Sequence, residues 1–127
     1  MLLYMSATAT YNLPPGLLRA VCYTESHHNV RAIHFDDGSG TSLGTCQVQL
    51  ESAREMGFDG SEKELMEPYN NVKYAGLYLR SRLRRNGNDV VLGVASYNAG
   101  SVIRKPNGDL INQAYVDKVM DAWAEGL

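Results

Sequence analysis

Apolar residues recur at intervals of three and four positions along most of this 127-residue chain, and the pattern stops once, between residues 26 and 46. Residues three and four apart lie on one face of an α-helix, so these stripes predict helices that pack through their apolar faces. The segment from 36 to 42 consists of Asp, Gly, Ser and Thr, which favour turns. We therefore expect a mainly α, α+β fold: a compact helical domain with one long irregular loop or small hairpin.

Capping residues and prolines indicate where the expected helices begin and end. Pro14 and Pro15 suit a first helical turn, and Gly57 suits a helix end. Ser61 and Glu64 have the spacing of a capping box. The expected helices run from about 2 to 10, from 14 or 15 through 25, from 50 to 56, from 61 onward, from 70 or 71 through 83, from 89 through 95, and from 115 through 123.

The size and charge of the chain limit the classes of protein to which it can belong. A chain of 127 residues can bury a core without metal or disulfide crosslinks, so we expect one monomeric domain over residues 1–127. The formal net charge is −2, so nucleic acid is not an expected partner. No run approaches the roughly 18 apolar residues that cross a membrane. Residues 1–5 are apolar but lack a basic segment and a cleavage site, so we expect part of the fold and no signal peptide.

The cysteines and histidines do not form a recognisable metal motif. Cys22 and Cys46 are too few for a disulfide framework, and their spacing matches no zinc site. We expect two small buried side chains that lie close together and stay reduced, with a disulfide as the alternative. His27, His28 and His34 lack the spacing of a zinc-binding helix, so no metal and no cofactor are expected.

Glu25 stands out because it continues an apolar stripe that includes Leu18, Val21 and Cys22. A carboxylate on a buried face is unfavourable unless it has a purpose. Burial and the negative end of the helix dipole both disfavour its charged form, so the pKa of Glu25 should be raised, which suits a general acid near neutral pH. The alternative is a frayed helix end at which Glu25 is open to water.

Two later segments carry groups that suit a sugar ligand. In the first, Gly44 permits a close approach of the backbone to another segment, and the amide of Gln47 can both donate and accept hydrogen bonds. In the second, Tyr97 and Asn98 place a flat ring and an amide next to small residues. Sugars offer apolar faces and hydroxyl edges, which rings and amides can meet. Taken alone, each segment also fits ordinary packing and capping.

Together these residues resemble a known catalytic domain. Glu25-Ser26, Gly44-Thr45-Cys46-Gln47, Tyr97-Asn98-Ala99-Gly100 and Tyr115 occur in the order and rough spacing of the soluble lytic transglycosylase domain, and the resemblance covers about Tyr11 to Trp123. That family has the lysozyme-like fold and is related to goose-type lysozymes. The resemblance implies cleavage of the β-1,4 bond between N-acetylmuramic acid and N-acetylglucosamine in peptidoglycan, with 1,6-anhydro ends as product.

The resemblance also implies roles for individual residues. Glu25 matches the catalytic acid/base, and Tyr97 is expected beside it, where it would orient the carboxyl group. His34 stands where a serine is often found. The substrate-binding residues implied by the resemblance are Ser26, His34, Gln47, Tyr97, Asn98 and Tyr115. Residues 36–42 form an insertion beside the expected cleft. Through this insertion the chain resembles the bacteriophage-borne branch of the family.

Two other functions remain open at this point. A goose-type lysozyme would hydrolyse the same bond with water and would need a second carboxylate, which Asp36 or Asp37 could supply. A non-catalytic wall-binding virion module would be expected to have lost the acid. In each case the partner is the glycan strand of peptidoglycan, and the place of action is the cell wall, in the periplasm or outside the cell, or on a virion.

The arginines at 80, 82, 84 and 85 lie near the end of an expected helix. They are expected to form a solvated helix end, where cations complement the helix dipole. Contact with anionic cell-wall polymers is the alternative.

Overall fold

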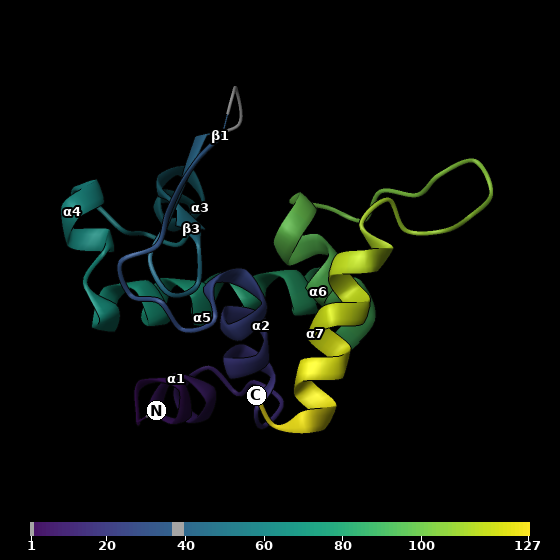
Figure 1. Cartoon of the computed structure of the whole chain (residues 1–127), viewed down its shortest axis with the longest axis horizontal. Coiled ribbons are helices and arrows are strands. Elements are labelled where there is room, and N and C mark those ends of the chain that lie inside the picture. Colours follow the sequence, from purple (N-terminus) through teal and green to yellow (C-terminus); the bar gives the residue numbers. More distant parts are fainter. Residues whose placement is uncertain (1, 37–39) are drawn as a thin grey trace.

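The computed structural model describes residues 2–36 and 40–127, and over these residues it contains seven helices and one antiparallel sheet of three short strands (Figure 1). The helices are α1 (Leu2–Thr10), α2 (Leu17–Ser26), α3 (Leu50–Glu55), α4 (Glu62–Leu65), α5 (Pro68–Arg85), α6 (Val90–Ala99) and α7 (Gln113–Glu125). The strands are β1 (Ile33–Asp36), β2 (Gly40–Leu43) and β3 (Val48–Gln49). The expected helical domain with a small hairpin after the second helix is confirmed.

Local capping explains most of the helix ends. The predicted capping box opens α4, where Ser61 Oγ accepts the backbone N–H of Glu64 at 3.1 Å and Glu64 Oε1 accepts that of Ser61 at 2.9 Å. The predicted cap at Asp89 also opens α6. The predicted start of the long helix at residue 70 or 71 is wrong. α5 begins at Pro68, and Asn71 lies inside it, fully buried, because its amide bonds to other segments of the chain.

The core forms where α2 packs between its neighbours. α2 contacts α7 along its length and also contacts α5, and α5 packs in addition against α1 and α6. The apolar residues of the α2 stripe, Leu18, Val21 and Cys22, are fully buried in this core, and Glu25 at the end of the stripe is half-buried. In Figure 1 the sheet, α3 and α4 lie on one side of α2, and α6 and α7 lie on the other. The C-terminal end of α2 is therefore held between two groups of elements.

The sheet aligns three polar side chains in one row. His34 in β1 is paired with Ser42 in β2, and Ser42 is paired with Gln49 in β3. Paired residues on neighbouring strands project to the same face of a sheet. His34, Ser42 and Gln49 therefore share one face.

Cys22 and Cys46 form a disulfide, so the expectation that they stay reduced is wrong. Cys22 lies in α2 and Cys46 in the turn before β3, and their Cα atoms are 4.2 Å apart. Both residues are fully buried. The expectation that the two cysteines lie close together is confirmed, because the turn at residues 44–47 packs against α2.

The apolar start of the described chain belongs to the packed structure. α1 places Tyr4 and Ala7 in the core. Within the described residues, every helix is too short or too polar to cross a membrane.

Candidate active site

A pocket of about 450 Å³ opens at the C-terminal end of α2, where the sheet, α3, α5 and α6 meet. The residues predicted from the sequence motifs that line it are Glu25, Gln47, Tyr97 and Asn98. The polar residues that line it without having been predicted as ligands are Ser42, Gln49, Ser52 and Tyr78. Among the described side chains of this pocket, Glu25 supplies the single carboxylate.

Glu25 has the properties expected of a general acid. Its side chain is half-buried at the last turn of α2, and its Oε2 accepts a hydrogen bond from the Tyr115 hydroxyl at 2.7 Å. Burial raises the pKa of Glu25 to about 7, and the hydrogen bond from Tyr115 opposes the rise because it stabilises the charged form. A carboxyl group with this pKa can both give and take a proton near neutral pH.

The structure assigns the contact with the acid to Tyr115 and not to Tyr97. Tyr97 is buried, and its hydroxyl donates to the Cys46 carbonyl at 3.0 Å. Burial, and then the nearby charge of Glu25, hold the pKa of Tyr97 well above its usual value. Tyr97 therefore lies near the acid and lines the pocket, but its hydroxyl holds the turn at Cys46. The hydrogen bond to Glu25 that was expected of Tyr97 is made in the described structure by Tyr115.

Gln47 lies in the turn on the sheet side of the pocket, with its backbone at a φ of 50°. Its side-chain amide donates to the Gly44 carbonyl at 2.9 Å and to the Ala32 carbonyl at 3.2 Å. The two N–H groups of the amide are thus used within the protein. The carbonyl oxygen of the amide is the group that can meet a ligand.

Asn71 in α5 also holds the turn at residues 44–47, a role that was not predicted for it. Its Nδ2 donates to the carbonyls of Leu43 at 2.8 Å and Leu65 at 3.0 Å, and its Oδ1 accepts from the Cys46 backbone at 2.9 Å. Gly44 has a φ of 79°, and a Cβ there would lie 2.5 Å from Asn71 Nδ2. Gly44 is therefore required both by its conformation and by the closeness of Asn71.

Three predicted ligands lie in different settings. Ser26 lies outside the pocket lining, because its Oγ donates to the Thr45 carbonyl at 2.6 Å and so links α2 to the turn. Asn98 is exposed at the pocket, and its Oδ1 accepts from Asn112 Nδ2 at 2.9 Å. His34 is exposed and does not line the pocket, but it shares a sheet face with Ser42, which does.

The predicted alternative carboxylates are not placed by the structure. Asp37 and the side chain of Asp36 lie outside the residues that it describes. Over the described residues, no group of three or more His, Cys, Asp or Glu side chains is arranged to hold a metal ion. The described pocket thus offers acid–base chemistry through one carboxyl group, with hydroxyl and amide groups around it.

Comparison with known proteins identifies a family and several relatives. The Transglycosylase SLT domain family matches residues 3–112. Protein IpgF of Shigella flexneri is 30% identical over 98 residues, which are 75% of this chain and 63% of that protein. The X polypeptide of Escherichia coli is 30% identical over 92 residues, 71% of this chain and 54% of the other. The Transglycosylase of Enterobacteria phage PRD1 is 30% identical over 115 residues, 91% of this chain and 39% of the phage protein.

These relatives are longer than the region they share with this chain, which spans between 39% and 63% of their lengths. The family match includes Glu25, Gln47 and Asn98 but ends before Tyr115, so the place of Tyr115 beside the acid rests on the geometry alone. Because the match covers most of the chain and contains the residues that line the pocket, the chain belongs to the SLT transglycosylase family.

Proposed function

We propose that this chain is a peptidoglycan lytic transglycosylase that cleaves the β-1,4 bond between N-acetylmuramic acid and N-acetylglucosamine and leaves 1,6-anhydromuramoyl ends. The observation that carries the proposal is the half-buried carboxyl group of Glu25, which has a raised pKa and accepts a hydrogen bond from Tyr115. Among the described side chains that line the pocket, it is the one carboxylate. Membership of the SLT transglycosylase family supports the same substrate.

In the first step Glu25 acts as an acid. With a pKa of about 7, about half of the molecules carry the proton at neutral pH. The protonated carboxyl group donates to the glycosidic oxygen, the bond from that oxygen to C1 of the muramic residue breaks, and its electrons stay on the oxygen. The substrate's own N-acetyl group stabilises the positive charge that develops at C1.

In the second step the same group acts as a base. The Glu25 carboxylate takes the proton from the C6 hydroxyl of the muramic residue, and the oxygen of that hydroxyl bonds to C1. The Tyr115 hydroxyl supports the carboxylate between the two steps, because a hydrogen bond to the charged form stabilises it. The proton returns to Glu25, and no water is consumed.

The surrounding polar groups would hold the sugars. Gln47 and Asn98 line the pocket from its two sides, since Gln47 follows the hairpin and Asn98 lies in the last turn of α6. Ser42 and Gln49 extend the sheet side of the pocket, and His34 continues their row outward. We assign these side chains to the binding of successive sugar hydroxyl and N-acetyl groups.

The proposed place of action is the bacterial cell wall, outside the cytoplasm. The disulfide supports this location, since disulfides persist in oxidising compartments and are rare in the cytosol. The similarity to a phage transglycosylase supports a virion-associated or phage-encoded role. We propose that residues 1–127 act as one catalytic domain, because the described elements share a single hydrophobic core.

Mass spectrometry of the muropeptides released from purified sacculi tests the proposed reaction. We expect 1,6-anhydro ends, which are lighter than reducing ends by one water. Glu25→Gln should fold and lose roughly 10²–10⁴-fold in rate, because the amide keeps the shape and removes the proton. Asp36→Asn and Asp37→Asn should keep most activity. Reducing ends together with an inactive aspartate variant would instead identify a water-using lysozyme with two carboxylates.

A further inference from the structure

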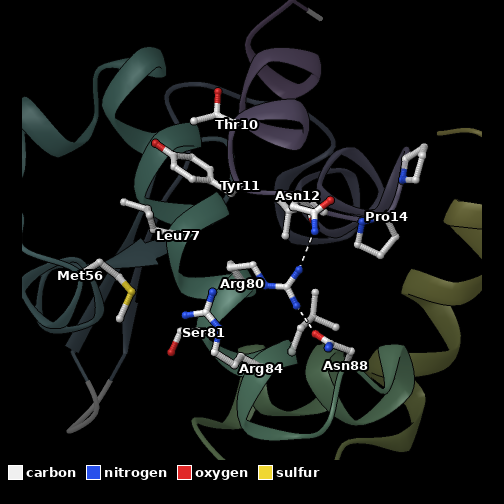
Figure 2. Close-up of a pocket in the computed structure, with 13 residues that line it drawn as sticks. Thr10, Tyr11, Asn12, Pro14, Met56, Leu77, Arg80, Ser81, Arg84 and Asn88 are labelled. Carbon is white, nitrogen blue, oxygen red and sulfur yellow. Dashed lines mark hydrogen bonds between the residues drawn. The ribbon is translucent and has the colours of Figure 1, made fainter.

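A second hollow, of about 950 Å³, lies on another face of α5 (Figure 2). It shares no lining residue with the pocket that contains Glu25. Leu77, Arg80, Ser81 and Arg84 line it and recur at intervals of one helical turn, whereas Tyr78 faces the Glu25 pocket. The opposite wall comes from the chain between α1 and α2. We call this hollow the α5 groove.

The four arginines of α5 fall into two pairs with different surroundings. Arg82 and Arg85 both contact Glu55 Oε2, at 2.5 Å and 3.4 Å. Arg80 and Arg84 line the α5 groove, and neither makes an ion pair with any residue of the described chain. None of the residues that line the groove is acidic. Two uncompensated positive charges therefore meet in one hollow.

Arg80 is held in place within the groove. One of its terminal N–H groups donates to the Asn12 carbonyl at 2.7 Å, and another donates to the Asn88 side chain. Its Nε is buried and has no partner in the described structure. Figure 2 shows the Arg80 side chain between Asn12 and Asn88, with Arg84 next to it along the helix. A guanidinium group fixed in this way loses little freedom when it binds a ligand.

The positive charge of the groove is local. The whole chain has a formal net charge of −2, so the groove does not reflect a generally basic protein. Guanidinium groups bind phosphate oxygens through two parallel hydrogen bonds, and Ser81 and Asn88 add neutral donors beside them. The volume of the hollow is far larger than one phosphate group, which favours an extended ligand.

We propose that the α5 groove binds the phosphate groups of an anionic polymer of the bacterial envelope. The choice of an envelope polymer rests on the proposed function, whereas the charge and shape of the groove do not. A catalytic domain that also holds such a polymer would stay close to its glycan substrate after each cut.

Fluorescence anisotropy with labelled poly(glycerol phosphate) and the whole chain tests this inference. Arg84→Gln should weaken binding by about tenfold, as expected for the loss of a charged hydrogen bond. Arg85→Gln is the matched control, because it removes the same charge from the next position while its partner is Glu55. It should change binding by less than about twofold. Ser81→Glu, which adds a negative charge inside the groove, should weaken binding without removing a contact that holds Arg80. Binding should also fall steeply as salt rises.

Several outcomes would overturn the inference. One is the absence of binding, and another is equal weakening by Arg84→Gln and Arg85→Gln, which would indicate a general charge effect. Tighter binding of polyglutamate would indicate a carboxylate ligand, and tighter binding of single-stranded DNA would indicate a nucleic-acid groove. Glu25→Gln should keep polymer binding, and Arg84→Gln should keep cleavage of sacculi stripped of anionic polymers. The groove and the reaction can therefore fail independently.

Discussion

At the scale of single residues, the proposed chemistry depends on the hydrogen bond between Glu25 and Tyr115. Burial raises the pKa of Glu25, and the Tyr115 hydroxyl limits the rise. Burial of Tyr115 is the main reason that its own pKa lies well above the usual value, and the charge of Glu25 adds to the rise. This hydroxyl therefore stays protonated and donates. The pair thus sets the pH range in which Glu25 carries its proton.

This pair predicts a shift in the pH profile of a Tyr115→Phe variant. The value of kcat/KM should fall as pH rises through the pKa of Glu25, about 7 in the wild type. Loss of the hydrogen bond should raise that pKa further, so the fall should move to higher pH, with a lower maximal rate because the carboxylate formed in the reaction loses support. The measurement is the rate of sacculus solubilisation across pH.

Tyr97→Phe provides the control for that profile. The Tyr97 hydroxyl bonds to the Cys46 carbonyl and not to Glu25, so its loss should leave the midpoint of the profile unchanged. A midpoint that moves in Tyr97→Phe and stays fixed in Tyr115→Phe would show that the acid is oriented as the sequence motif implied, and not as the geometry shows.

At the scale of elements, the site depends on how the turn at residues 44–47 is held against α2 and α5. A Gly44→Ala variant should lower the free energy of unfolding because its φ of 79° disfavours a side chain and because the new Cβ meets Asn71. Gly57→Ala is the control, since Gly57 has a φ of 95° and no atom within 4 Å of an added Cβ. Urea unfolding should show a larger loss for Gly44→Ala. Equal losses would mean that the contact with Asn71 costs nothing.

The disulfide joins the same two elements. Removing it by Cys22→Ala with Cys46→Ala should lower the free energy of unfolding by roughly 3 kcal/mol, the usual size for a native disulfide. A reductant should destabilise the wild type in urea and leave the double variant unchanged. Intact mass after unfolding in iodoacetamide, without reductant, should show no alkylation. Two alkylated cysteines in that experiment would contradict the bridge.

At the scale of the whole molecule, burial of Glu25 should make the stability of the fold depend on pH. The pKa of Glu25 is raised from 4.5 to about 7, so between these values the folded state binds more protons than the unfolded state. The contribution of this proton to the free energy of unfolding is therefore complete below about pH 4.5. It is lost as pH rises through about 7.

The Glu25→Gln variant measures this dependence, because its amide does not titrate and can still accept from Tyr115. Its melting temperature should match that of the wild type near pH 4 and exceed it at pH 8. A variant that melts below the wild type at pH 8 would show that the Glu25 carboxylate is not a desolvated group.

Much of the architecture could be predicted because its causes are local. The capping box at Ser61 and the cap at Asp89 each involve groups within one helical turn, and the stripe of α2 follows from helical spacing. The same stripe predicted that Glu25 lies on a buried face, and the sequence motifs predicted Gln47 and Asn98 as ligands. All three residues line the pocket. Sequence by itself therefore determined most of the helices, the family and the place of Glu25 at the pocket.

Only the tertiary structure decided which side chains meet. Tyr115 reaches Glu25 across 90 positions of sequence, because α7 packs along α2, and the same folding brings Cys22 within bonding distance of Cys46. Asn71 is of a residue type that often caps helices, but its buried side-chain amide instead bonds to the turn at residues 44–47. Capping and periodicity act within a turn or two of chain, whereas these contacts depend on how whole helices pack, and no local pattern records that packing.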